Sequence, residues 1–330
     1  MRHSAALARR VTMLPPMESE TRISEDRAWE PDRYAPPPVV PATRRPFPPS
    51  VNLACFLLTV VTTLIAGTLL TLDDLSPATV RDVFLTPSLW TLGLPYSLSL
   101  ILILGAHEMG HYVACRIYRI DASLPFFIPG PPILGTFGAV IRIRAPFTSR
   151  RALFDIGVAG PIAGFVVALP VLAFGLSRST LLHQGAGRHG VVFTPCLLLQ
   201  LAVSRFFPGL LPGDAVQIHS VVVAAWVGLL ATFLNLLPVG QLDGGHVLYA
   251  LSARAHRLIS RAGIFLLIAG GVLAHGAHLV VFGILWAIIG PRHPPVLGDT
   301  QRLGPGRILV ALIALVIFIL CVIPQSPGLS

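Results

Sequence analysis

The chain has 330 residues, of which 54% are hydrophobic and 12% are charged, and its mean hydropathy is +0.75. Because soluble domains carry about 25% charged residues, this composition excludes an ordinary soluble protein and predicts an integral membrane protein. The formal net charge of +9 comes from arginines in short clusters between apolar runs. That pattern follows the positive-inside rule, so we expect a lipid bilayer around the protein and no nucleic-acid partner.

Residues 1–49 differ from the rest of the chain. They are rich in Pro, Arg and acidic residues and contain no apolar run. Such a segment cannot bury enough apolar surface to fold, so we expect a disordered cytoplasmic tail. It has no apolar core of the kind that a signal peptide needs. A multi-span membrane domain is expected over residues 50–330.

About 20 apolar residues are needed for a helix to cross a bilayer. The apolar region 262–290 is longer than that and is interrupted by "AHGAH", which leaves either one long tilted helix or a hairpin of two short helices. We expect six to eight spans in all. The other long apolar runs predict spans at 51–71, 95–115, 154–177, 217–240 and 306–323.

Residues 121–152 are apolar but cannot form one helix, because five Pro and three Gly interrupt them. The later part, "GAVIRIR", alternates apolar and polar residues with the period of a strand. Non-helical backbone at membrane depth is tolerated only where protein or a water-filled cavity covers it. We therefore expect a hairpin or re-entrant loop here.

Arginine clusters orient the spans. The tail and residues 116–119, 142–151 and 254–261 are the Arg-rich flanks. Placing all four on the cytoplasmic side gives a consistent path in which the second span runs inward. The end of that span, near residue 115, then lies close to the cytoplasmic face.

The stretch "LGAHEMGHYVACRIY" (104–118) places three ionisable residues within the second predicted span. His107 and His111 are four apart, so a helix would present both imidazoles on one face, where they can bind one metal ion. Glu108 lies beside them and could reach an activated water without being a ligand, the H-E-x-x-H arrangement of zinc hydrolases. Ionisable residues in hydrocarbon are costly, which favours a functional site.

Two histidines do not complete a catalytic zinc site, which has three protein ligands and an open position. No Glu follows Glu108, so a downstream Glu ligand is excluded. Asp243 stands in "NLLPVGQLDGGH" (235–246), at the cytoplasmic end of the fourth predicted span and at the expected depth of His107 and His111. The other later Asp residues lie at span boundaries or in Pro- and Gly-rich loops: Asp121, Asp155, Asp214 and Asp299.

The two motifs together resemble the site-2 protease family, the intramembrane zinc metalloproteases. The resemblance covers residues 95–260 and implies an all-α polytopic membrane protein, with a site-2 protease-like helical core and a re-entrant β-hairpin loop. Residues 178–216 are too few for a PDZ domain and no CBS domain follows the last span, so we expect the compact type. The matching stretches are "HEMGH", "NLLPVGQLDGG", "GTFG" (135–138), "GVAGPIAGF" and "AAWVGLLATFLNLLP".

The resemblance implies a metal site and a base. His107, His111 and Asp243 would bind one Zn2+ ion per chain, and Glu108 would be the general base. Asn235 would hydrogen-bond the substrate backbone or the tetrahedral intermediate.

It also implies a substrate path. The "GTFG" loop would hold an extended substrate strand by edge pairing, with Gly135 and Gly138 allowing close approach. The substrate would be a transmembrane protein already cleaved by another protease. The location would be the bacterial inner membrane, with the N-terminus and active site toward the cytoplasm.

Other interpretations of the ligands and of the function remain open from the sequence alone. His246 could be a fourth ligand or a partner of one, or it could cap a helix or face water. Cys115, one turn beyond His111, could replace Asp243. A metal-binding transporter or sensor, or an inactive protease-like scaffold, would also account for a buried metal site.

Overall fold

The computed structural model describes residues 48–72, 76–182, 195–209, 214–273, 277–290, 293, 296 and 302–322. These residues belong to one compact unit, Ala42–Ser330. Apart from its last two residues, the tail predicted at 1–49 lies outside the described residues, so its disorder stays a prediction.

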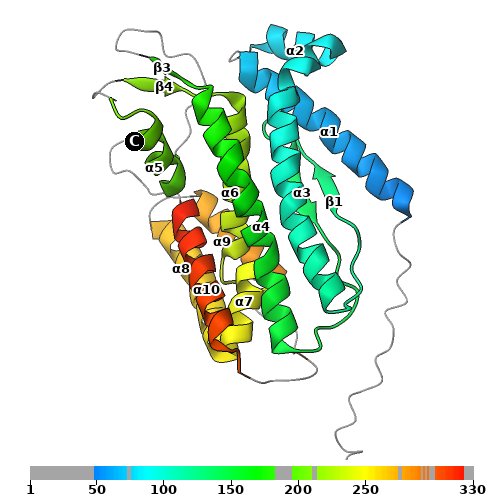
Figure 1. Cartoon of the computed structure of the whole chain (residues 1–330), viewed down its shortest axis with the longest axis vertical. Helices are drawn as coiled ribbons and strands as arrows, with labels where there is room; N and C mark the ends of the chain where they lie inside the picture. Colours follow the sequence, from blue (N-terminus) through cyan, green and yellow to red (C-terminus); the bar gives the residue numbers. More distant parts are fainter. Residues whose placement is uncertain are drawn as a thin grey trace, which may run out of the picture. The chain divides into compact units, whose positions relative to one another are not determined.

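The described part of the chain is mostly helical, which confirms the predicted fold class (Figure 1). The strands are β1 (Phe126–Pro129), β2 (Thr136–Val140), β3 (Thr180–Leu182) and β4 (Ala215–Gln217). The helices are α1 (Pro49–Leu72), α2 (Pro77–Leu85), the 3-10 helix η2 (Pro87–Gly93), α3 (Leu94–Ile117), α4 (Arg150–Ser177), α5 (Leu197–Phe206), α6 (Ser220–Leu236), α7 (Asp243–Leu251), α8 (Ala253–Leu273), α9 (Ala277–Ile289) and α10 (Pro305–Cys321).

Four described helical segments are long and apolar enough to cross a membrane: α1, the continuous run of η2 and α3, α4 and α8. The protein is therefore a multi-pass membrane protein. Helix α6 is shorter than the span predicted at 217–240, whereas α10 closely matches the span predicted at 306–323. Each has 17 residues, which is about 25 Å at 1.5 Å per residue. Helix α6 ends because Pro238 disfavours helical backbone at Leu237, whose ψ is 129°.

The region 262–290 forms the hairpin alternative. Helices α8 and α9 pack against each other, and α8 begins at Ala253, before the predicted start. The predicted strand hairpin is also present. Strands β1 and β2 pair antiparallel with Phe126 opposite Val140, and β1 packs on α1. The alternation of "GAVIRIR" continues past β2 only as a single bridge between Ala122 and Ile143.

Helices α3 and α4 run antiparallel side by side and form the most extensive helix contact (Figure 1). Glycines make the close approach possible. A Cβ atom built at Gly110 of α3 would lie 2.5 Å from the carbonyl oxygen of Ala159 on α4. This confirms that the small residues of "GVAGPIAGF" suit close helix packing.

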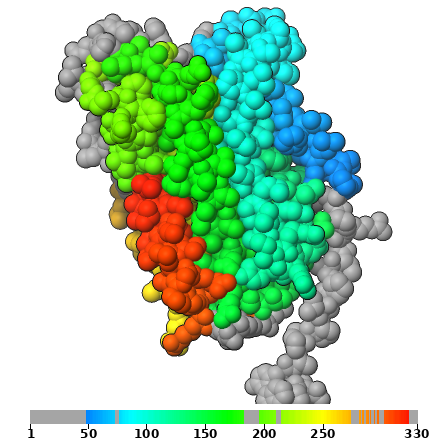
Figure 2. All heavy atoms as spheres, in the orientation of Figure 1, coloured from blue at the N-terminus to red at the C-terminus, as the bar shows by residue number. Residues whose placement is uncertain are grey.

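Helix α10 lies against α4, as the orange-red and green atoms of Figure 2 show. The start of α10 is tied to the core by Arg307, whose Nε and Nη2 donate to the two carboxylate oxygens of Asp155 at 2.9 and 2.7 Å. The hydroxyl of Tyr118, at the end of α3, donates to the same carboxylate. Asp155, which lies at a predicted span boundary, is thus paired with an Arg.

The sequence did not predict α2, η2 or the pairing of β3 with β4. These elements are short and carry no long apolar run. Helix α2 is recognisable only from its start, where the Ser76 side chain accepts from the N–H of Thr79 and Pro77 occupies the first turn.

Candidate metal centre

His107 and His111 lie one turn apart on α3, and both side chains are buried. Their Nε2 atoms are 3.2 Å apart. Residues four apart on a helix share a face, which is why both imidazoles point to the same place.

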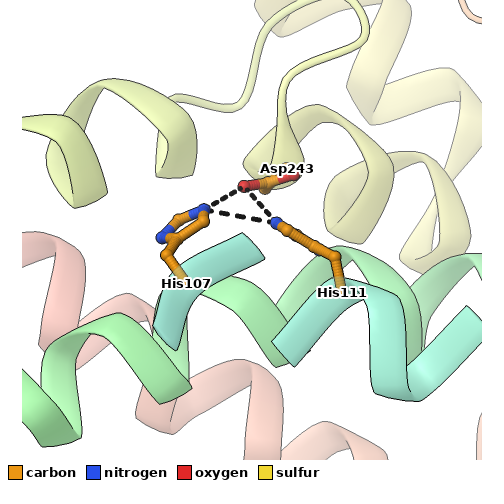
Figure 3. Close-up of side chains that lie close together, drawn as sticks. All are labelled: His107, His111 and Asp243. Carbon is orange, nitrogen blue, oxygen red and sulfur yellow. Dashed lines mark hydrogen bonds and ion pairs between the residues drawn. The ribbon is translucent and has the colours of Figure 1, made fainter. Parts of the chain in front are cut away.

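Asp243 joins them from α7, of which it is the first residue. Its Oδ2 lies 3.2 Å from Nε2 of His107 and 3.1 Å from Nε2 of His111 (Figure 3). The following residue must be Gly, because a Cβ at Gly244 would lie 1.9 Å from the carbonyl oxygen of Leu236. The start of α7 thus folds directly onto the end of α6, which brings the carboxylate to α3.

The backbone of α4 orients one of the imidazoles. His111 Nδ1 lies 2.7 Å from the carbonyl oxygen of Ile156. A carbonyl only accepts, so Nδ1 carries the proton and a neutral imidazole has its lone pair on Nε2. Metal-binding histidines are generally held in this way by their second nitrogen.

Glycines of α4 form the wall behind both histidines. A Cβ at Gly160 would lie 2.1 Å from Nε2 of His111, and one at Gly164 would lie 3.1 Å from the ring of His107. Both imidazoles therefore pack against the backbone of α4, at positions where glycine has no side chain. The "GVAGPIAGF" helix is not only a packing surface, but also gives the histidines their room.

The three side chains fit a metal ion. They offer two imidazole nitrogens and one carboxylate oxygen, and these ligand atoms all lie within 4.8 Å of one another. Two His and one carboxylate are a ligand set of catalytic zinc, and three ligands leave an open position. Both histidines are buried within a span and Asp243 is half-buried beside them, a setting that favours a functional site.

Glu108 lies beside this group but is not part of it. Its side chain is buried, and the backbone of Ile141 lies near its carboxylate. Ile141 directly follows β2, so the Glu108 carboxylate sits at the end of the strand hairpin. The site thus holds two carboxylates. That of Asp243 lies against the two histidines, and that of Glu108 lies at the strand hairpin.

Asn235 also reaches the site. Its Nδ2 lies 3.2 Å from Nε2 of His107, and it comes from the last turn of α6. The amide is therefore next to the group that would hold the metal, although its predicted contact with substrate stays a prediction.

The two glycines of the hairpin have different surroundings. Gly135 has φ +79°, and a Cβ there would lie 2.5 Å from Cα of Thr63. Its carbonyl oxygen accepts from Thr62 Oγ1 at 2.6 Å, so Gly135 fixes the hairpin turn to α1. Gly138 has φ +107° and nothing within 4 Å of its Cβ position, which leaves room for another chain to approach.

The remaining candidates lie outside the three-residue group. Among the described residues, neither Cys115 nor His246 belongs to the group whose ligand atoms lie within 4.8 Å of one another. Cys115 is fully buried among apolar residues, and His246 Nδ1 lies 2.6 Å from Nε2 of His293. Sequence reasoning missed Ile156 and Gly160, because their part in the site depends on the packing of α4 against α3.

Comparison with known proteins matches residues 95–273 to the model of peptidase family M50. The chain is 30% identical over 295 residues to "Probable zinc metalloprotease EGY1, chloroplastic" of Oryza sativa subsp. japonica, covering 83% of this chain and 50% of that protein. Its Arabidopsis thaliana counterpart is 30% identical over 294 residues, 83% of this chain and 53% of that protein. The chain thus spans about half the length of these relatives.

Among solved structures, the "Site-2 Protease from Methanocaldococcus jannaschii" aligns with a TM-score of 0.33 and 18% identity, over 72% of this chain and 90% of that chain. The family assignment rests instead on the sequence match, which covers more than half of the chain and contains both motifs. The chain belongs to peptidase family M50, the site-2 protease family that the two motifs resemble.

Proposed function

We propose that this protein is an intramembrane zinc endopeptidase that hydrolyses a peptide bond in or near a transmembrane segment of another protein. The observation that carries the proposal is the meeting of two buried histidines, His107 and His111, with the half-buried Asp243 among membrane-spanning helices. The buried Glu108 follows His107 on the same helix. The curated relatives bear the name zinc metalloprotease, which supports the same chemistry.

The roles of the residues follow from their positions. A zinc ion held by His107, His111 and Asp243, one per chain, would supply Lewis-acid activation of a water molecule. Glu108 would accept the proton of the attacking water and pass it to the leaving amine nitrogen. Asn235 would donate a hydrogen bond from Nδ2 to the carbonyl oxygen of the scissile peptide.

The strand hairpin would present the substrate to these residues. Strand β1 is covered by α1, and no described strand pairs with the other edge of β2. An unwound substrate segment could pair with that edge past Gly138, where there is open space. The edge leads to Ile141, whose backbone lies near the Glu108 carboxylate. A substrate strand bound there would run toward the general base.

The proposal extends to orientation and partner. Arg clusters lie at the end of α3 (116–119) and at the start of α4 (142–151), so the positive-inside rule would place the site toward the cytoplasm. The chloroplastic names of the relatives give no support to the expected bacterial inner membrane. A substrate already shortened by another protease would enter more easily, because a bulky outer domain would hinder access.

The test compares Glu108→Gln with Asp121→Asn in protein reconstituted with a single-span membrane protein as substrate. Glu108→Gln should lower the cleavage rate by about 10²- to 10⁴-fold, the usual contribution of a general base. Its zinc content should stay near that of the wild type. Asp121 is an exposed acid paired with Arg144, so Asp121→Asn should cleave normally.

The same experiment separates the alternatives. Cleavage that survives in Glu108→Gln would contradict the proposed mechanism. Zinc bound by a wild type that cleaves nothing would instead favour a metal-binding transporter, sensor or inactive scaffold.

A further inference from the structure

The loop between α6 and α7, residues 237–242, determines where Asp243 stands. At its centre Gly240 has φ +55°, a left-handed conformation that suits glycine. The loop folds back onto α7, because a Cβ at Gly245 would lie 2.6 Å from the carbonyl oxygen of Gly240. Any displacement of Gly240 would therefore move the first turn of α7 and the carboxylate of Asp243.

Two side chains of α8 hold Gly240 by its backbone. His256 Nε2 lies 2.9 Å from the Gly240 carbonyl oxygen, and the Gly240 N–H donates to Ser260 Oγ at 3.3 Å. The two residues are four apart on α8, and both are fully buried. Both hydrogen-bonding groups of one glycine are thus satisfied by one helix.

These contacts determine which nitrogen of the His256 imidazole carries the proton. The Gly240 carbonyl can only accept, so His256 carries its proton on Nε2. The Nδ1 atom is buried and has no hydrogen-bond partner among the described residues. An apolar side chain would avoid that unpaired nitrogen and could still pack against Tyr249, whose ring centroid is 5.5 Å away. The contact that an apolar residue could not make is the one with Gly240.

We infer that His256 and Ser260 are positioning residues that hold the third metal ligand in place through Gly240. The inference rests on the proposed function, since it concerns the zinc site proposed there. Neither residue would touch zinc or substrate. They would act through a backbone contact that keeps Asp243 near His107 and His111, as residues that orient metal ligands generally do.

The test measures zinc affinity of the full chain in detergent by competition with a chromophoric chelator. His256→Phe keeps an aromatic ring beside Tyr249 but removes the donor, and it should bind zinc about tenfold more weakly. His256→Gln loses the ring but keeps an amide donor near the position of Nε2, so it should bind more tightly than His256→Phe. A role in packing alone predicts the reverse order.

Two further variants complete the design. Ser260→Ala removes the acceptor for the Gly240 N–H and should also weaken zinc binding. Thr68→Val deletes a fully buried hydroxyl on α1 and should leave zinc affinity unchanged. The visible absorption of the cobalt(II)-loaded protein should change in His256→Phe and stay near that of the wild type in His256→Gln.

The outcomes separate this inference from the proposed function. Wild-type affinity in both His256→Phe and Ser260→Ala would overturn the inference alone, provided that the wild type binds zinc. A wild type that binds no zinc would overturn the proposed function and this inference with it.

Discussion

Gly160 shows how a missing side chain can define a site. Its Cα faces the imidazole of His111, and a methyl group there would need the space that Nε2 occupies. The carbonyl of Ile156, one turn earlier on α4, accepts from the opposite nitrogen of the same ring. One helix thus sets both the position of His111 and its protonation pattern.

We predict that Gly160→Ala lowers zinc affinity by about tenfold or more, because the ring must tilt away from Asp243. Overpacking of this kind also destabilises a fold by about 1–3 kcal/mol. Metal titration and thermal unfolding in detergent measure the two effects. Gly270→Ala on α8 is the matched control, since nothing lies within 4 Å of its Cβ position. Equal zinc affinity in the two variants would contradict the account.

At the scale of the elements, α4 is held between α3 and α10. The Arg307–Asp155 contact is made of two hydrogen bonds, and both side chains are about 30% exposed, so the pair is only partly screened by solvent. Asp155 directly precedes Ile156, whose carbonyl orients His111. The ion pair therefore stabilises the same turn of α4 that serves the metal centre.

Replacing Arg307 with Gln should destabilise the protein by about 1–3 kcal/mol, the range for hydrogen bonds to charged groups. Thermal unfolding in one detergent measures this against Arg302→Gln, whose side chain is exposed. Arg307→Gln, Asp155→Asn and the double variant that combines them form a mutant cycle. Additive losses in that cycle would show that the two residues do not interact.

The strand hairpin depends on its attachment to α1. Gly135→Ala should detach the hairpin turn, because the new methyl would meet Cα of Thr63 and a left-handed alanine costs about 1–2 kcal/mol. Hydrogen exchange of β1 and β2 should rise and substrate cleavage should fall. Gly209→Ala, with open space around it, should change neither. Unchanged exchange in Gly135→Ala would refute the proposed anchoring.

At the scale of the whole molecule, the sequence predicts most of the architecture. Apolar length locates α1, α3 and α4, and the Pro and Gly residues of 121–152 rule out a helix where the hairpin forms. Apolar length overestimates α6, because Pro238 ends the helix inside an apolar run. Large apolar side chains still face outward on α1, α8 and α10, as expected of surfaces in lipid.

The site is predictable to the extent that it is local. The four-residue spacing of the histidines places them on one helix face whatever the fold, and depth in the membrane points to Asp243. The supporting residues are not predictable in this way. Gly160 and His256 act because α4 and α8 pack where they do, and a single sequence carries no sign of those contacts.

The central claim is that two distant motifs meet at one zinc ion, and metal analysis of the purified protein tests it most directly. We predict about one zinc per chain in the wild type and a sharp loss in Asp243→Ala, whose carboxylate lies within 3.2 Å of both histidines. Zinc retained in full by Asp243→Ala would show that the third ligand is another residue. A wild type without zinc after metal loading would contradict the zinc centre itself.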